Sequence, residues 1–148
     1  MKKHKFKLAA VLKLREAKEK KIKSELGEIV QEIQKVKERL QEIDNDVDVL
    51  YSSQEQSVQT PAAGRMVRFY PEAVRGLKAD KVATLNLLAA LERRYQRKVE
   101  ELKVAMGETK VMNKLKEKDF AAHKKQVMKK ELETLEEIIM LRPKENSQ

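Results

Sequence analysis

One line of apolar residues runs through the first third of the chain and repeats every seven residues. Its members follow each other in steps of four and three: Ile22, Leu26, Ile29, Ile33, Val36, Leu40, Ile43, Val47 and Leu50. Because an α-helix has about 3.6 residues per turn, such a line stays against a partner helix only in a left-handed coiled coil. An all-α fold is therefore expected, and function depends on what the helix packs against.

The three prolines, Pro61, Pro71 and Pro143, fall outside the periodic segments. Proline lacks the backbone donor and clashes with the preceding turn, so helices are predicted at about residues 5–57 and 72–141 with a connector over 58–71. A second apolar line is expected at Leu85, Leu88, Tyr95, Val99, Leu102 and Met106. These features predict one coiled-coil domain over residues 1–148, folded as an antiparallel hairpin of two long helices.

Folding back about this connector brings together residues whose numbers add to about 129, such as Leu40 and Leu88. The same extrapolation places Arg15 and Glu19 in the seam opposite Lys110 and Asn113, as a polar layer that fixes the register.

The second helix is expected to extend past the start of the first over residues 125–141. This overhang carries several apolar side chains: Met128, Leu132, Leu135, Ile138, Ile139 and Leu141. An apolar helix face without a partner in its own hairpin is a candidate docking surface for another protein, and self-association of the tail stays open as an alternative.

Charge is concentrated at the beginning of the chain. The net charge is +9, and residues 1–24 carry ten Lys or Arg against two Glu, whereas residues 25–60 carry three against nine. This basic end favours an acidic partner, although a solvated helix face explains the same pattern. No apolar stretch is long enough for a bilayer span, and the absence of cysteine suits a reducing cytoplasm.

Sequence motifs for enzymatic chemistry are absent. The chain has no phosphate-binding glycine loop, nucleophile elbow or zinc-protease motif, and His4 and His123 make a poor metal site without cysteine. We expect no cofactor, metal site or catalytic activity. The basic start lacks an Asn that could read adenine and is interrupted by apolar residues, so nucleic acid is not the expected partner.

Three segments carry a resemblance to a known family. The opening Phe6-Lys7-Leu8-Ala9-Ala10-Val11-Leu12-Lys13-Leu14-Arg15-Glu16, the basic stretch 110–118 and the acidic stretch 132–138 resemble the FliJ family, the coiled-coil component of the flagellar type III export apparatus. The usual Asp-Glu near the end of that family is Glu136-Glu137 here.

The resemblance implies a stalk-like coiled coil, similar to that of rotary ATP synthases, that binds and activates the hexameric export ATPase FliI. It also implies contacts with the export gate FlhA and with export chaperones, in the cytoplasm at the inner-membrane export apparatus. Candidate ATPase-binding residues are Lys13, Arg15, Lys18, Lys20, Lys21, Met128, Leu132, Leu135 and Ile139. Candidate gate-binding residues are Phe69, Tyr70, Ala73, Val74 and Leu77.

The residues leave other interpretations open. An injectisome stalk protein has the same pattern, and a generic coiled-coil scaffold or a membrane-surface adaptor accounts for the heptads and the basic amphipathic start. Phe69 and Tyr70 are either a binding anchor or a cap over the end of the hairpin.

Overall fold

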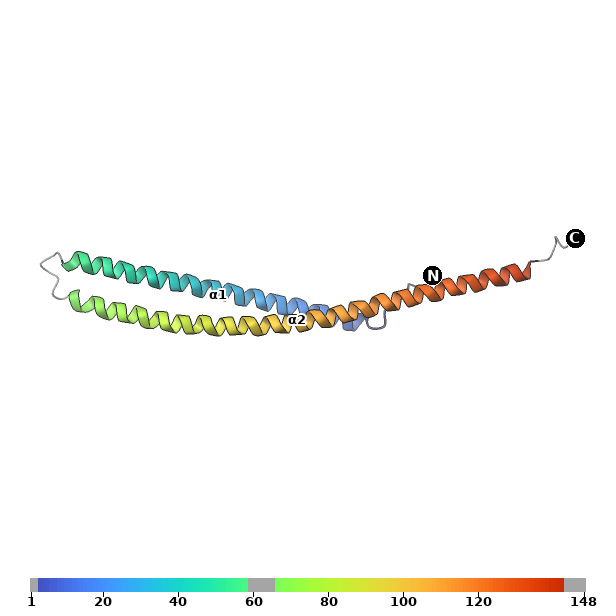
Figure 1. Ribbon diagram of the computed structural model, residues 1–148, viewed down its shortest axis with the longest axis horizontal. Coiled ribbons are helices and arrows are strands. Elements are labelled where there is room, and N and C mark those ends of the chain that lie inside the picture. The colour runs from blue at the N-terminus through green and yellow to red at the C-terminus, as the bar shows by residue number, and fades with distance from the viewer. Residues whose placement is uncertain (1–2, 59–65, 143–148) are drawn as a thin grey trace. The chain divides into compact units, whose positions relative to one another are not determined.

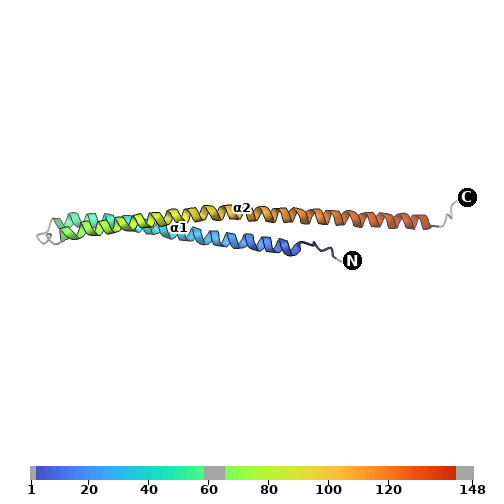
Figure 2. The same ribbon diagram turned by 90° about the horizontal axis from the view of Figure 1, so that it is seen from below.

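The computed structural model describes the backbone of residues 3–58 and 66–142. It contains two helices, α1 (Ala9–Val58) and α2 (Met66–Leu141), and no strand within these ranges. The chain divides into two parts, residues 21–102 and residues 1–20 with 103–148, and each is described by itself. In each part α1 and α2 lie side by side and run in opposite directions (Figures 1 and 2). The predicted all-α helical hairpin is confirmed, and the single domain stays a prediction.

Two predicted helix boundaries are wrong. Helix α1 begins at Ala9 rather than near residue 5, and α2 begins at Met66 rather than near residue 72. Pro71 therefore lies inside α2. Pro71 is only the sixth residue of the helix, so its ring disturbs only a carbonyl of the first turn. The φ angle that its ring fixes is also compatible with a helix. The predicted turn residues 60–64 lie outside the described residues.

The α1 side of the seam matches the sequence prediction. All nine residues of the line from Ile22 to Leu50 are buried or half-buried, and Ile43 is fully buried. Continued toward the N-terminus, the same line passes through Glu19 and Arg15, which are half-buried as well. One heptad frame thus runs through α1 in both parts of the chain.

The α2 side of the seam differs from the prediction. Leu85 and Met106, expected in the core, are 45% and 47% exposed, and Lys110 and Asn113 are exposed too. Steps of four and three instead connect the buried and half-buried residues Tyr70, Val74, Leu77, Lys81, Thr84, Leu88, Leu91, Tyr95, Lys98, Leu102, Ala105, Thr109 and Met112.

Polar residues can occupy this seam because each satisfies its polar atoms locally. The ammonium groups of Lys81 and Lys98 reach Asp44 and Glu25 on α1, while their aliphatic stems stay at the seam. The hydroxyls of Thr84 and Thr109 donate to the carbonyls one turn earlier in α2, at 2.7 and 3.0 Å. A search for apolar periodicity therefore misses these positions.

The ion pairs fix the register between the helices. The residue numbers add to 125 for Lys81 and Asp44, and to 123 for Lys98 with Glu25 and for Arg15 with Glu108. The predicted value of about 129 is wrong because α2 starts earlier: the last residue of α1 and the first of α2, 58 and 66, add to 124. Leu40 consequently faces Thr84 and not Leu88.

This register predicts a specific disulfide. In a chain without native cysteine, Leu40→Cys with Thr84→Cys should crosslink within one chain, because facing seam positions lie within disulfide reach. Leu40→Cys with Leu88→Cys is the matched control, displaced by one helical turn, and should crosslink far more slowly. Mass spectrometry after mild oxidation measures both; equal yields, or links between chains, contradict the register.

The pair of Glu25 and Lys98 shifts both ionisation equilibria. The hydrogen bond from Lys98 lowers the pKa of Glu25 below its ordinary 4.5, and the bond to Glu25, helped by Glu101, raises the pKa of Lys98 above 10.5. Hydrogen bonds to Asp80 and Glu42 likewise raise the pKa of Arg39.

These shifts make the stability of the hairpin depend on pH. The contribution of the ionised Glu25 to stability is present above pH 4.5 and is lost as pH falls below it. The Lys98 contribution is present below pH 10.5 and is lost as pH rises through its folded pKa.

Candidate functional site

The segment before α1 is fastened to α2. Phe6 is buried and forms one apolar cluster with Leu12 of α1 and Met112 of α2. Its carbonyl accepts a hydrogen bond of 3.1 Å from the amide of Ala9, which turns the chain into the helix. The apolar Phe6 among the N-terminal lysines therefore has a structural role in closing this end of the seam.

The two histidines meet beside this cluster. Their rings stack with centroids 4.0 Å apart, and His4 lies edge-on to Phe120 at 5.1 Å. The Nε2 atom of His4 is 2.6 Å from a carboxylate oxygen of Asp119. Among the described residues, no group of three or more His, Cys, Asp or Glu side chains is placed to hold a metal ion. These contacts hold residues 3–8 against α2.

The five cations predicted to bind the ATPase have different surroundings. Arg15 donates to Glu108 at 2.6 Å, and the ammonium of Lys18 lies 3.6 Å from the same carboxylate. Lys13 and Lys20 are exposed and one heptad apart, and Lys21 is exposed beside Glu25, whose pKa it helps to lower. Arg15 and Lys18 thus connect α1 to α2, whereas no ion pair to α2 is described for Lys13, Lys20 and Lys21 within residues 3–58 and 66–142.

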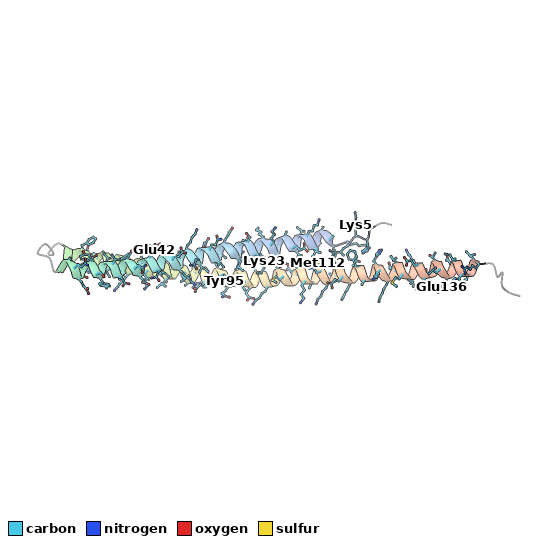
Figure 3. All side chains as sticks on the ribbon, turned by 90° about the horizontal axis from the view of Figure 1, so that it is seen from above. Lys5, Lys23, Glu42, Tyr95, Met112 and Glu136 are labelled. Atoms are coloured by element: carbon cyan, nitrogen blue, oxygen red, sulfur yellow. The ribbon has the colours of Figure 1, made fainter. Side chains whose placement is uncertain are left out.

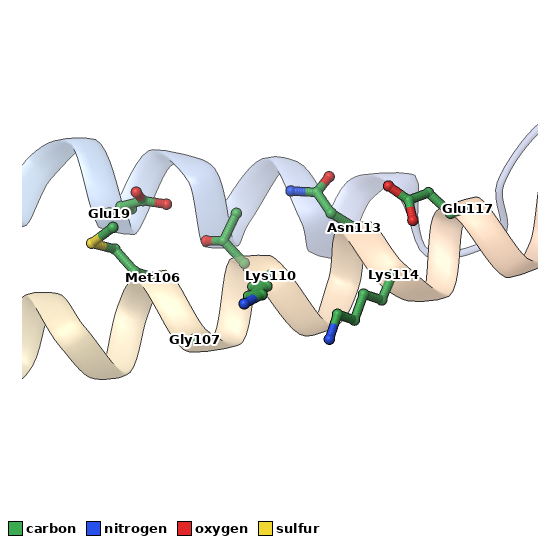
Figure 4. A pocket seen from close by; sticks show the side chains of 8 residues that line it. Glu19, Met106, Gly107, Lys110, Asn113, Lys114 and Glu117 are labelled. Carbon is green, nitrogen blue, oxygen red and sulfur yellow. The ribbon is translucent and has the colours of Figure 1, made fainter.

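An open depression lies where the seam becomes polar. Figure 4 shows its lining: Glu19, Met106, Gly107, Thr109, Lys110, Asn113, Lys114 and Glu117. A Cβ built on Gly107 meets no atom within 4 Å, so side-chain packing does not explain this glycine. The depression carries both charge signs and is open to solvent, so it does not provide the enclosed environment that catalysis uses.

Beyond His123, α2 continues past the start of α1 (Figures 1 and 2), and we call residues 124–142 the C-terminal segment. Figure 3 labels Glu136 on it. The four apolar residues predicted to bind the ATPase, here called the C-terminal stripe, are all more than half exposed: Met128 54%, Leu132 59%, Leu135 54% and Ile139 66%. Their steps of four, three and four place them on one face of the helix. They form an exposed apolar line on one face of α2.

The five predicted gate-binding residues lie at the start of α2. Phe69 is 57% exposed, whereas Tyr70 and Val74 are buried at 8% and 7%, and Ala73 and Leu77 are half-buried. The rings of Phe69 and Tyr70 contact each other edge-on at 5.7 Å. Tyr70 occupies a seam position, so of the two aromatic residues only Phe69 presents its ring to solvent.

The heptad spacing of α2 could have predicted that Tyr70 is buried and Phe69 is exposed. Steps of four and three back from Leu88 reach Thr84, Lys81, Leu77, Val74 and Tyr70. Consecutive residues of a helix point about 100° apart, so only one of the two aromatic residues can lie in the seam.

The comparisons with known proteins give one match. The family model of the flagellar FliJ protein matches residues 4–147, nearly the whole chain. No curated protein and no solved structure shows a significant match. No helix among the described residues is long and apolar enough to cross a membrane. With the two-helix hairpin and the match over almost its full length, the chain belongs to the flagellar FliJ protein family.

Proposed function

We propose that this chain, as a component of the flagellar export apparatus, is a non-enzymatic stalk that binds and activates the export ATPase ring and links it to the export gate. Family membership supports the role in flagellar export. The observation that carries the ATPase contact is the C-terminal stripe, which exposes four aligned apolar residues on a helix that α1 leaves uncovered. An exposed apolar helix face of this kind is stabilised when a partner protein covers it.

The three exposed lysines add a second element to the proposed ATPase contact. Lys13, Lys20 and Lys21 lie on the outer surface of α1, and charges of this kind steer association more than they hold the final complex. Their contribution should decrease when salt shortens the screening length to about 3 Å at 1 M.

Reversing these charges tests the proposed ATPase contact. Lys13→Glu, Lys20→Glu and Lys21→Glu together should reduce stimulation of ATP hydrolysis by the export ATPase by about tenfold at low salt. The helical circular dichroism should stay unchanged, since the side chains are exposed. Lys78→Glu, which changes an exposed lysine of α2 far along the sequence, is the control; unchanged stimulation by the triple variant refutes this role.

The gate contact is proposed to depend on Phe69. Phe69→Ala should weaken binding to the export gate by about tenfold or more and leave the melting temperature nearly unchanged, because an exposed aromatic ring is a typical anchor. Tyr70→Ala is the matched control: its ring is buried in the seam, so its removal should lower the melting temperature. Normal gate affinity of Phe69→Ala measured by calorimetry contradicts the proposal.

Chaperone binding is part of the same proposal, on the resemblance of the whole chain to the family. Association with the inner-membrane apparatus follows in this proposal from the gate contact and not from a membrane span.

A further inference from the structure

The C-terminal stripe does not continue the seam of the hairpin. The line of α2 that meets α1 and the segment before it passes through Met112, Asp119 and His123. Continuing the alternating steps of three and four along this line reaches the exposed polar residues Gln126, Lys130, Glu133 and Glu137, and the half-buried Val127 lies next to it, one residue before the stripe begins. The stripe therefore lies on a different face of α2, so its partner is not an extension of the α1 packing.

Charge along the C-terminal segment is separated into two blocks. The first block is basic and contains Lys124, Lys125, Lys129 and Lys130. The second is acidic and contains Glu131, Glu133, Glu136 and Glu137. The acidic block lies at the middle of the C-terminal stripe, so the orientation of two such helices depends on the charges directly beside the stripe and not on the blocks as a whole.

We propose that the C-terminal segments of two copies of this chain pair as an antiparallel coiled coil. With the stripe as the core, Met128 lies opposite Ile139 of the second copy, and Leu132 lies opposite Leu135. The twofold symmetry repeats both layers, so the pairing buries all four exposed residues of each stripe.

The charged residues beside the stripe determine the orientation. In antiparallel helices, Lys129 faces Glu136 of the second copy, and the symmetry gives this pair twice. In parallel helices, Glu131 would face Glu136, and Lys124 would face Lys129, so both flanking contacts would be repulsive. No contact of Lys129 or Glu136 with another charged side chain competes within the described residues.

This pairing has a consequence for the proposed ATPase contact, because it covers the same four residues. A chain paired with its copy cannot present the C-terminal stripe to the ring. Self-association and ATPase binding would therefore exclude each other, and an excess of the ATPase would dissociate the pair.

Exchanging the charges of Lys129 and Glu136 tests the proposed dimer in the absence of the ATPase. Sedimentation equilibrium of the full chain at low ionic strength, from micromolar to millimolar concentration, should approach twice the chain mass of 17.2 kDa. Lys129→Glu and Glu136→Lys should each weaken dimerisation about tenfold, because each places like charges together twice. The double variant Lys129→Glu, Glu136→Lys should restore it, and an equimolar mixture of the two single variants should form mixed dimers.

The alternatives give different results. Parallel pairing would be strengthened by Lys129→Glu, since the new carboxylate faces Lys124. Dimerisation through another face would not respond to these substitutions. Either result, or a mass of 17.2 kDa at every concentration, overturns the proposal. Because the sedimentation experiment contains no ATPase, the absence of dimers would not contradict the proposed function. That function is tested separately by stimulation of ATP hydrolysis.

Discussion

Replacing Ile43 by alanine is expected to lower the free energy of unfolding by about 2–5 kcal/mol, the range for deleting a buried branched side chain. Ile43 is fully buried, and a two-helix seam is only one side chain thick. Few neighbouring groups are available to fill the space, so relaxation recovers little of the loss. Urea unfolding followed by circular dichroism at 222 nm measures the change.

The control for Ile43 is a residue of the same helix that points to solvent. Val49 is 61% exposed, so Val49→Ala should change the free energy of unfolding by less than about 0.5 kcal/mol. Similar losses at both positions would mean that the seam is not where α1 buries its side chains.

Placing two carboxylates on the C-terminal stripe is expected to abolish activation of the export ATPase. Leu132→Glu with Leu135→Glu introduces two charges into the face that we propose docks in the ring, and burying an unpaired charge is costly. Both side chains are more than half exposed, so the hairpin itself should keep its melting temperature. Stimulation of ATP hydrolysis, measured against ring concentration, gives the result.

The matched control adds the same two charges to another face. Gln126→Glu with Thr134→Glu changes exposed residues of the same segment and should leave most of the stimulation intact. Equal loss in both variants would assign the effect to the charge of the segment as a whole, and the docking face would have to be sought elsewhere.

The α1 seam could be predicted from the sequence because its positions from Ile22 to Leu50 are all Ile, Leu or Val. The α2 seam could not be predicted by the same criterion. It includes Lys81, Lys98, Thr84 and Thr109, whose polar atoms are satisfied by Asp44, by Glu25 and by carbonyls of α2 itself. Those partners become visible only when the two helices are placed together.

The start of α2 was missed because proline is usually read as the end of a helix. Pro71 lies early in α2, between the flanking seam residues Tyr70 and Val74, which are both buried. The error of several residues at this boundary displaced the predicted register by about one helical turn. Similarly, a count of positive charges cannot show that Arg15 and Lys18 contact Glu108.

The shared heptad frame of α1 and α2 in residues 21–102 limits how the length of such a hairpin can change in evolution. An insertion in one helix alone displaces every facing pair beyond it and separates Lys98 from Glu25. Compensated changes must add or remove matched blocks of seven residues in both helices, at equal distances from the connector. Related chains of different lengths should therefore differ in pairs of heptads, so that the spacing between the two ends of the hairpin changes in steps of about 10 Å.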